Sequence, residues 1–356
     1  MKLGTGVLTS GVGQLNAERI AAYCREIAQL RRQGVEVVVV SSGAIALGMG
    51  KLGLSKRPTD LASLQCCAAI GQAQLIQTWQ SGFEPEGIHV AQVLFTRDDL
   101  RGRRRHVAAL QMLESVLSKG VIPIVNENDS ISTEEIQFGD NDVLSALVAS
   151  LVKADPLIIL SRAPGLVNLR GDGKLIPLVT EFTPEILAMA EGTVDPTGRG
   201  GMVTKLEAAE IANQSGCGVF IGSGENPGIL VNLFAGEPEG TFFIPNGNTL
   251  RSKQRWIAFF HRPAGRLVVD AGAREAVEGN GKSLLAKGLL SAEGDFGTQA
   301  VVEIADREGR LFARGVCSYN SDRLRQVAGW SNREIQAQYP DQKPVEVVHR
   351  DGLVVL

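Results

Sequence analysis

Residues 121–142, VIPIVNENDSISTEEIQFGDND, lead from a short apolar run through a polar segment. The β-branched run Val121–Val125 is typical of a buried strand. Apolar residues then recur at helical spacing over Val143–Val152, which predicts a helix directly after the polar segment. Open α/β sheets bind their ligands at such strand-to-helix connections. The stretch therefore predicts an α/β fold with a site at this point.

Six carboxylates lie in this segment, and no Lys or Arg occurs between Lys119 and Lys153 to balance them. The acidic residues are Glu127, Asp129, Glu134, Glu135, Asp140 and Asp142. The alternative interpretation is an acidic surface loop in which Asp140 or Asp142 caps the following helix.

Strands and helices alternate to about residue 250, which predicts an open, mostly parallel sheet sandwiched by helices. Besides a very short first strand at Lys2–Leu3, we expect strands at 35–40, 89–95, 121–125, 157–160 and 218–224. Helices are expected at 15–32, 61–79, 108–117 and 206–215.

The pattern changes after residue 250, because short strands with little helix follow at 266–270, 300–304, 311–316 and 345–349. Asp306–Arg310 is a plausible hairpin turn between two of them. A chain of 356 residues is also long for one domain. We therefore expect a first domain over residues 1–250, a linker over 251–262 and a small β-rich domain over 263–356.

Composition narrows the class of protein. A net charge of −3 and a pI near 5.9 give no overall nucleic-acid footprint, and the basic run Arg101–Arg105 reads as a solvated or subunit-facing cluster. The five cysteines form no CxxC pair, which favours a reducing compartment over disulfides or a zinc site. No apolar run reaches the ~20 residues of a membrane span, and the N-terminus has no signal-peptide core. We expect a cytoplasmic protein.

Two further connections suit an anion. Ser42 and Gly43 follow a predicted strand and precede a helix, where backbone N–H groups bind carboxylates or phosphates; a simple Ser N-cap is equally compatible. The segment Thr197–Lys205 places glycines and a lysine before another helix, as phosphate binding requires. The GxGxxG match at Gly48–Gly53 does not join a strand to a helix, so we discount it.

Taken together, these motifs resemble the glutamate 5-kinase family of the amino acid kinases. The motifs occur in the family's order and approximate spacing: Lys2–Thr5, Ser41–Ala46, Asn126–Asp129, Gly139–Asp142 and Gly200–Lys205. The tail from about Gly265 to Gly329 resembles the PUA domain of many bacterial members. The expected architecture is thus an amino acid kinase fold followed by a PUA-like β-rich domain.

The resemblance implies ATP-dependent phosphorylation of the γ-carboxylate of L-glutamate, the first step of proline biosynthesis. It assigns Lys2 and Lys205 to the phosphates and Asp142 to orienting these lysines. It assigns glutamate binding to Ser42, Asp129 and Asn141. ATP binding falls to Lys2, Ser161, Arg162, Arg199, Gly200, Gly201, Met202, Val203, Thr204 and Lys205.

The chemistry fits this assignment, because a carboxylate nucleophile is already ionised at pH 7 and needs no catalytic base. Mg²⁺ is expected on the nucleotide phosphates, with no metal site of the protein's own. The family further implies a homo-oligomer and feedback inhibition by proline. Residues Ser130–Gly139 are expected to form a mobile flap over the glutamate.

Three departures from the family pattern bear on these roles. The apolar run that usually precedes the lysine is missing, so either the start is late or Lys2 lies at a frayed terminus. Arg199 replaces the Thr that family members usually have in the glycine segment. Ser161-Arg162 stands where many members have Thr-Asp, near the expected nucleoside pocket.

Two alternatives stay open. The first is another amino acid kinase that phosphorylates a different acyl, carbamoyl or phosphate acceptor. The second is an RNA-binding regulatory protein that acts through the PUA-like tail, although that tail is charge-mixed and poor in aromatic residues for stacking. Residue by residue, Lys205 could be a solvated helix lysine, Asp142 only an N-cap, and Asn126 only an organiser of its loop.

Overall fold

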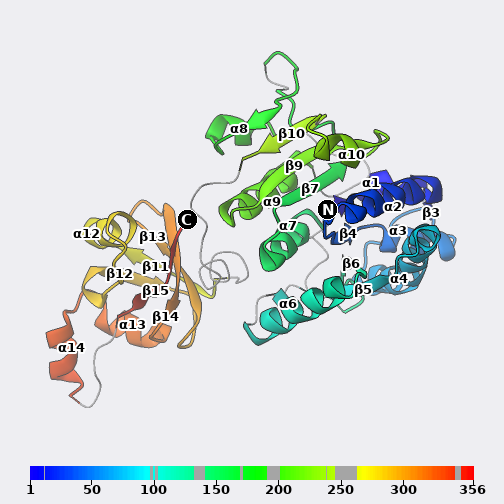
Figure 1. The fold of residues 1–356 in the computed structure, drawn as a ribbon. Helices are drawn as coiled ribbons and strands as arrows, with labels where there is room; N and C mark the ends of the chain where they lie inside the picture. Colours follow the sequence, from blue (N-terminus) through cyan, green and yellow to red (C-terminus); the bar gives the residue numbers. More distant parts are fainter. Residues whose placement is uncertain are drawn as a thin grey trace. The chain divides into compact units, whose positions relative to one another are not determined.

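The computed structural model describes residues 1–11, 13–96, 99–100, 103–131, 141–168, 171–190, 201–237, 239–244, 263–340 and 346–356. These residues fall into two compact units, one within residues 1–244 and the other within 263–356 (Figure 1). In the described part of the chain, no helix is long and apolar enough to cross a membrane.

The first unit is built on a central sheet that is parallel at every pairing except β9 with β10. Among the described residues it has eight strands, in the order β5 (Val90–Phe95), β6 (Ile122–Glu127), β4 (Val39–Ser41), β1 (Lys2–Leu3), β7 (Pro156–Ser161), β9 (Gly218–Ser223), β10 (Gly240–Phe243) and β8 (Leu178–Val179). A small hairpin, β2 (Thr9–Gly11) with β3 (Gln14–Leu15), lies apart from it. The predicted α/β class is confirmed.

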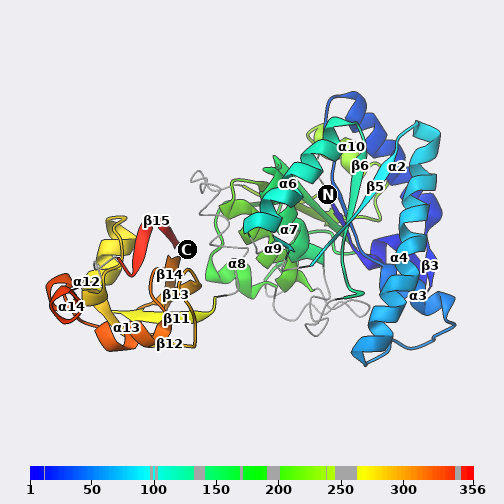
Figure 2. The same ribbon diagram turned by 90° about the horizontal axis from the view of Figure 1, so that it is seen from below.

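Helices cover both faces of this sheet (Figure 2). They are α1 (Thr5–Leu8), α2 (Ala17–Arg32), α3 (Ala44–Lys51), α4 (Leu61–Phe83), α6 (Arg103–Ser118), α7 (Asn141–Val152), α8 (Pro184–Ala188), α9 (Met202–Gln214) and α10 (Ile229–Phe234). The alternation along β7 shows the two layers, since Ile158 and Leu160 pack with α2 and α4 while Leu157 and Ile159 pack with α7 and α9. Burial on both faces explains why this strand reads as a continuous apolar run.

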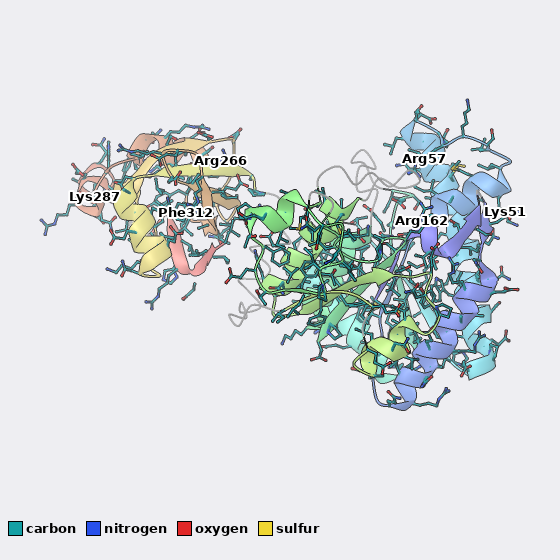
Figure 3. All side chains as sticks on the ribbon, turned by 90° about the horizontal axis from the view of Figure 1, so that it is seen from above. Lys51, Arg57, Arg162, Arg266, Lys287 and Phe312 are labelled. Atoms are coloured by element: carbon teal, nitrogen blue, oxygen red, sulfur yellow. The ribbon has the colours of Figure 1, made fainter. Side chains whose placement is uncertain are left out.

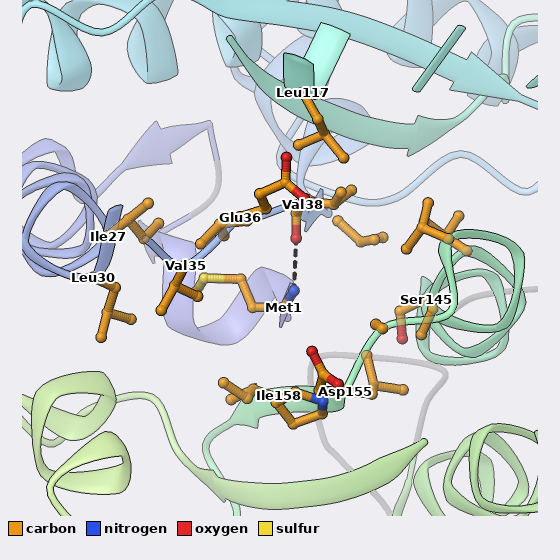
Figure 4. A pocket seen from close by; sticks show the side chains of 18 of the residues that line it. Met1, Ile27, Leu30, Val35, Glu36, Val38, Leu117, Ser145, Asp155 and Ile158 are labelled. Atoms are coloured by element: carbon orange, nitrogen blue, oxygen red, sulfur yellow. Dashed lines mark hydrogen bonds between the residues drawn. The ribbon is translucent and has the colours of Figure 1, made fainter. Parts of the chain in front are cut away.

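The strand predicted at residues 35–40 is shorter in the structure, because β4 covers only Val39–Ser41. Its neighbour β1 has two residues, which pair with Val40 and Ser41, so the residues before Val39 extend beyond the end of β1. A cavity of about 450 Å³ lies there, lined largely by apolar side chains of α2, α7 and the two flanking strands (Figure 4). The Met1 ammonium donates to the Val38 carbonyl at 2.6 Å, and burial lowers its pKa to about 5.

Two other predicted boundaries differ. Helix α4 continues to Phe83, beyond the predicted end at residue 79, because Phe83 is buried in the core with Trp79. Helix α6 begins at Arg103 and not near residue 108, so part of the arginine run lies inside its first turn, where Arg105 pairs with Asp99 at 3.2 Å.

The second unit has its own core and a five-stranded sheet among its described residues. Its strands are ordered β12 (Leu289–Glu293), β11 (Gly265–Val269), β13 (Val301–Ala305), β14 (Leu311–Cys317) and β15 (Val348–Val355). The predicted hairpin between β13 and β14 is confirmed, and Asp306 accepts the Arg310 N–H at 2.8 Å in its turn. The predicted β-rich unit is confirmed, and its sheet is accompanied by three short helices, α12 (Ala271–Arg274), α13 (Ser321–Val327) and α14 (Asn332–Gln338), each with a capping side chain.

Helices α3 and α4 pack at very close range through glycines. Gly48 lies against the Cys67 backbone, and Gly71 lies against the Ala44 carbonyl oxygen, so a Cβ at either position would clash. Gly48 is thus a packing residue inside a helix. This agrees with our decision to discount the GxGxxG match, since Gly48 does not join a strand to a helix. The contact between Gly71 and Ala44 holds the first residue of α3 against α4. It thereby also fixes the position of Ser42 and Gly43, which directly precede this helix.

We predict that Gly71→Ala lowers the free energy of unfolding by about 3 kcal/mol, the upper end of typical overpacking costs. Alanine favours an isolated helix by about 1 kcal/mol over glycine, so a loss can come only from the clash. Urea unfolding measures the change. Gly11→Ala is the control, since a Cβ there meets no atom within 4 Å; equal stability of the two variants would contradict the packing account.

Candidate active site

Four neighbouring parallel strands, β6, β4, β1 and β7, end at one edge of the central sheet. The chain moves from β1 to β4 on one side and later crosses to β7 on the other, so β1 lies at a switch in strand order. Open α/β sheets form their ligand sites at such switch points. The predicted site residues Lys2, Ser42, Asp129 and Ser161 lie at or just beyond these strand ends.

The geometric centre of the site is one carboxylate between two ammonium groups. Asp142 Oδ1 lies 2.5 Å from Lys2 Nζ, and Asp142 Oδ2 lies 3.2 Å from Lys205 Nζ. All three side chains are buried, with exposed fractions of 1%, 0% and 6% for Lys2, Asp142 and Lys205. The structure therefore does not place Lys2 at a frayed terminus, and Lys205 is not a solvated helix lysine.

Local structure brings these three residues together. Lys2 lies on the central strand, Asp142 in the first turn of α7, and Lys205 in the first turn of α9. Buried charges require partners, and three formal charges of this kind sum to one net positive charge. An ammonium has three N–H donors, so a contact with Asp142 does not preclude one with a phosphate oxygen. The cluster is suited to an anion.

Next to this cluster, Ser42 and Asn141 are joined. The Asn141 side-chain amide donates to Ser42 Oγ at 2.9 Å and to Asn126 Oδ1 at 2.8 Å. It also approaches the Ser41 carbonyl at 3.4 Å. Ser42 therefore joins this group through its side chain, and the alternative of a simple Ser N-cap is wrong, because the N-cap of α3 is Gly43 and no side chain caps the helix.

Asp129 lines a pocket of about 310 Å³ together with residues of α4, β5 and the end of β6. Burial raises the pKa of this carboxyl from 3.8 to about 6, and the positive charge of Arg57 opposes the shift. Arg57 lies in the connection between α3 and α4 (Figure 3). A carboxylate that is costly to ionise in the free protein gains most from a cationic ligand.

The predicted ATP segment is only partly described, because Arg199 and Gly200 lie outside the described residues. Gly201 precedes α9 as its N-cap and has no capping side chain, so the first N–H groups of the helix are suited to a phosphate. Thr204 Oγ1 lies 3.2 Å from Asp142 Oδ2, the carboxylate oxygen that Lys205 holds, and 3.0 Å from the Gly201 carbonyl oxygen, and its single proton can be donated to either one. Met202 is buried in the core, whereas Val203 is half exposed.

At the end of β7, Ser161 is buried whereas Arg162 is exposed. Ser161 Oγ accepts the Ala163 N–H at 3.1 Å and so organises its own turn. Arg162 is exposed, and its guanidinium lies against Gly6, where a Cβ would come within 2.7 Å of Nε. Arg162 is thus placed beside the turn that follows Lys2.

Several polar residues of the site were not assigned from the sequence. Asn126 donates to Gln72 Oε1 at 2.9 Å, and Gln72 donates to Gln92 Oε1 at 3.1 Å. Asn126 is therefore part of a buried network and not only an organiser of its loop. The sequence gives little signal for Gln72, because helix α4 contains four other glutamines, Gln65, Gln74, Gln77 and Gln80.

Other predicted features cannot be placed. Residues 132–140, which include Asp140 and most of the predicted flap, lie outside the described residues. Within the described part of the chain, no group of three or more His, Cys, Asp or Glu side chains is arranged to hold a metal ion.

Comparisons with known proteins identify the families of both units. Residues 1–223 match the amino acid kinase family, and residues 265–339 match the PUA domain. A glutamate 5-kinase of Myxococcus xanthus is 44% identical over 100% of this chain and 95% of its own length. Glutamate 5-kinases of Syntrophotalea carbinolica and Deinococcus radiodurans are 45% and 44% identical over 100% of this chain and 96% and 99% of their own lengths.

The match over residues 1–223, together with the mostly parallel sheet, shows that the chain belongs to the amino acid kinase family. Within that class, the chain belongs to the glutamate 5-kinase family. The resemblance drawn from the sequence motifs is confirmed.

We predict that glutamate affinity depends on the ionisation of Asp129. Its folded pKa is raised to about 6, so below that pH the carboxyl is protonated and cannot pair with an ammonium group. The KM for L-glutamate should rise about tenfold per pH unit below this value. Steady-state kinetics from pH 5 to about 8 at saturating ATP measure the effect.

Asp129→Asn is the matched control, because it should raise the KM at high pH and remove the pH dependence. The same pKa shift predicts an effect on stability without ligand, because the folded protein holds the Asp129 proton more tightly than the unfolded chain does. The contribution of the protonated carboxyl to the free energy of unfolding is therefore fully present below pH 3.8 and is lost as the pH rises through about 6. A pH dependence of KM that persists in the variant would assign the ionisation to another group.

Proposed function

We propose that this protein transfers the γ-phosphoryl group of ATP to the γ-carboxylate of L-glutamate. The products are L-glutamyl 5-phosphate and ADP, and the reaction is the first step of proline biosynthesis. The observation that carries the proposal is the buried cluster of Lys2, Asp142 and Lys205 beside Ser42 and Asn141. The relatives named glutamate 5-kinase support the choice of acceptor.

The acceptor needs orientation more than activation. Its γ-carboxylate is ionised at neutral pH and can attack phosphorus directly, so no side chain has to remove a proton. Asp129 would pair with the α-ammonium, while Ser42 would donate to a carboxylate of the substrate. A site that recognises both ends of an amino acid disfavours simple dicarboxylates, because its polar groups would be left unpaired.

Lys2 and Lys205 would stabilise the charge that develops on the transferring phosphoryl group. Phosphoryl transfer depends chiefly on positioning and on fixed positive charge. Asp142 holds one ammonium on each of its two oxygens and so fixes their separation, and Thr204 adds a contact to one of those oxygens. Arg162, beside Gly6, would lie on the nucleotide side of Lys2.

Mg²⁺ is proposed to arrive on the nucleotide. Asp142 is already held by two ammonium groups, and Mg²⁺ generally keeps several waters and binds substrate phosphates. The donor set of the described residues suits a cation carried by ATP, whose role when bound is to neutralise phosphate charge.

Three family expectations stay predictions. They are inhibition by proline, assembly into a homo-oligomer and a cytoplasmic location. Adding L-proline to the kinase assay tests the first, and sedimentation analysis tests the second.

The direct test is acyl phosphate trapping. The full chain is incubated with ATP, Mg²⁺ and hydroxylamine, together with L-glutamate, L-aspartate, N-acetylglutamate or carbamate, and hydroxamate and ADP are measured. Glutamyl hydroxamate in clear excess over the other products supports the proposal. ADP release with another acceptor and none with L-glutamate would support a different amino acid kinase, and no turnover at all would sink the proposed reaction.

We predict that Lys205→Ala lowers kcat about 10²- to 10³-fold, as for removal of a donor that acts mainly in the transition state. The KM for L-glutamate should change much less, because the lysine faces the phosphoryl group. Lys174→Ala is the control, since that side chain is 81% exposed and its ion pair is with the exposed Asp172. An unchanged kcat in the Lys205 variant would remove Lys205 from the transfer step.

A further inference from the structure

Four side-chain amides from four different elements form a continuous chain of hydrogen bonds. Asn141 of α7 donates to Asn126 of β6, Asn126 donates to Gln72 of α4, and Gln72 donates to Gln92 of β5. The distances are 2.8, 2.9 and 3.1 Å. We call these residues the amide relay.

The relay has a direction. In each inner member the oxygen accepts from one neighbour, so the nitrogen must donate to the next. Asn141, Asn126 and Gln72 are buried, with exposed fractions of 8%, 2% and 8%, whereas Gln92 is exposed. Flipping one buried amide, so that its oxygen and nitrogen exchange places, would bring two oxygens or two nitrogens together. Such a pair cannot form a hydrogen bond, which is costly away from water. Only Gln92 can turn over at little cost.

This direction determines what Asn141 can offer a ligand. Its NH2 group has two hydrogens, and the two short bonds to Asn126 Oδ1 and Ser42 Oγ use both. The remaining group is its carbonyl oxygen, which can only accept. Ser42 accepts from Asn141 and so keeps its own hydroxyl proton to donate.

We propose that the amide relay sets the hydrogen-bond polarity of the acceptor site, with Asn126 and Gln72 as positioning residues. Asn141 is held as an acceptor for the substrate ammonium, and Ser42 is held as a donor to a substrate carboxylate. The inference rests on the proposed glutamate kinase function and deepens it, because it names the residues that favour an amino acid over a dicarboxylate.

The pocket beside the relay is consistent with this role. Gln72 and Gln92 line the same pocket of about 310 Å³ as Asp129, the carboxyl group with the raised pKa. An ammonium bound there would meet the acceptor Asp129 and would restore the favourable ionised form of that carboxyl. The relay therefore connects the Asn141–Ser42 pair to the wall of the pocket that Asp129 shares.

The test compares Gln72→Met with Gln72→Glu. Methionine has a similar size but gives Asn126 no comparable acceptor, so the buried amides can turn over. The glutamate variant keeps the acceptor, and the exposed Gln92 can turn to donate to it. The measured quantity is the ratio of affinities for L-glutamate and glutarate, which lacks the ammonium, by calorimetry without turnover at about pH 8.

We expect the ratio to fall about tenfold in Gln72→Met, the size of a misplaced hydrogen bond to a charged group, and not to fall in Gln72→Glu. ATP affinity should stay the same in both. If Gln72→Met does not fold, Asn126→Leu against Asn126→Asp gives the equivalent comparison, because an ionised aspartate can only accept. An unchanged ratio in the folded Met or Leu variant would overturn the proposal, as would an equal fall in the Glu or Asp variant.

Wild-type binding separates this inference from the proposed function. Wild-type protein that binds L-glutamate but forms no glutamyl hydroxamate contradicts the kinase reaction while the relay is still tested by the ratio. Wild-type protein that binds glutarate as tightly as L-glutamate contradicts the relay even if glutamate is phosphorylated.

Discussion

The first unit depends on one carboxylate shared by two buried ammonium groups. Asp142 links the central strand, through Lys2, to the first turn of α9, through Lys205, and itself lies at the start of α7. An unpartnered charge at this depth would cost several kcal/mol, so β1, α7 and α9 must be placed where their three charged residues meet. That requirement fixes two cations at the carboxyl edge of the sheet, where phosphoryl charge can be stabilised.

Much of the fold could be predicted because its strands are buried on both faces and its helices are amphipathic. The run at β6 and the helical pattern of α7 located the site between them. The partners themselves could not be found from spacing, since Lys2 and Lys205 lie far away in the sequence. Family motifs identified them, and the structure brings them together.

The features that sequence reasoning missed depend on tertiary neighbours. The strand at residues 35–40 has the right residues for six positions, but its neighbour β1 pairs only with Val40 and Ser41, and Val39 pairs with β6 alone. Gln72 is one of five glutamines in α4, and only the fold shows that its amide meets Asn126. Hydrogen-bond direction is likewise a property of the assembled network, because each amide alone can turn either way.

The central claim is that Lys2 and Lys205 hold the phosphoryl group during transfer while Asp142 holds them. A crystal structure with ADP, Mg²⁺, aluminium fluoride and L-glutamate tests it most directly. The account predicts the fluoride group within hydrogen-bond distance of both lysine nitrogens, with the γ-carboxylate of glutamate in line and Asp142 between the lysines. A fluoride group bound elsewhere, with neither lysine in contact, would contradict it.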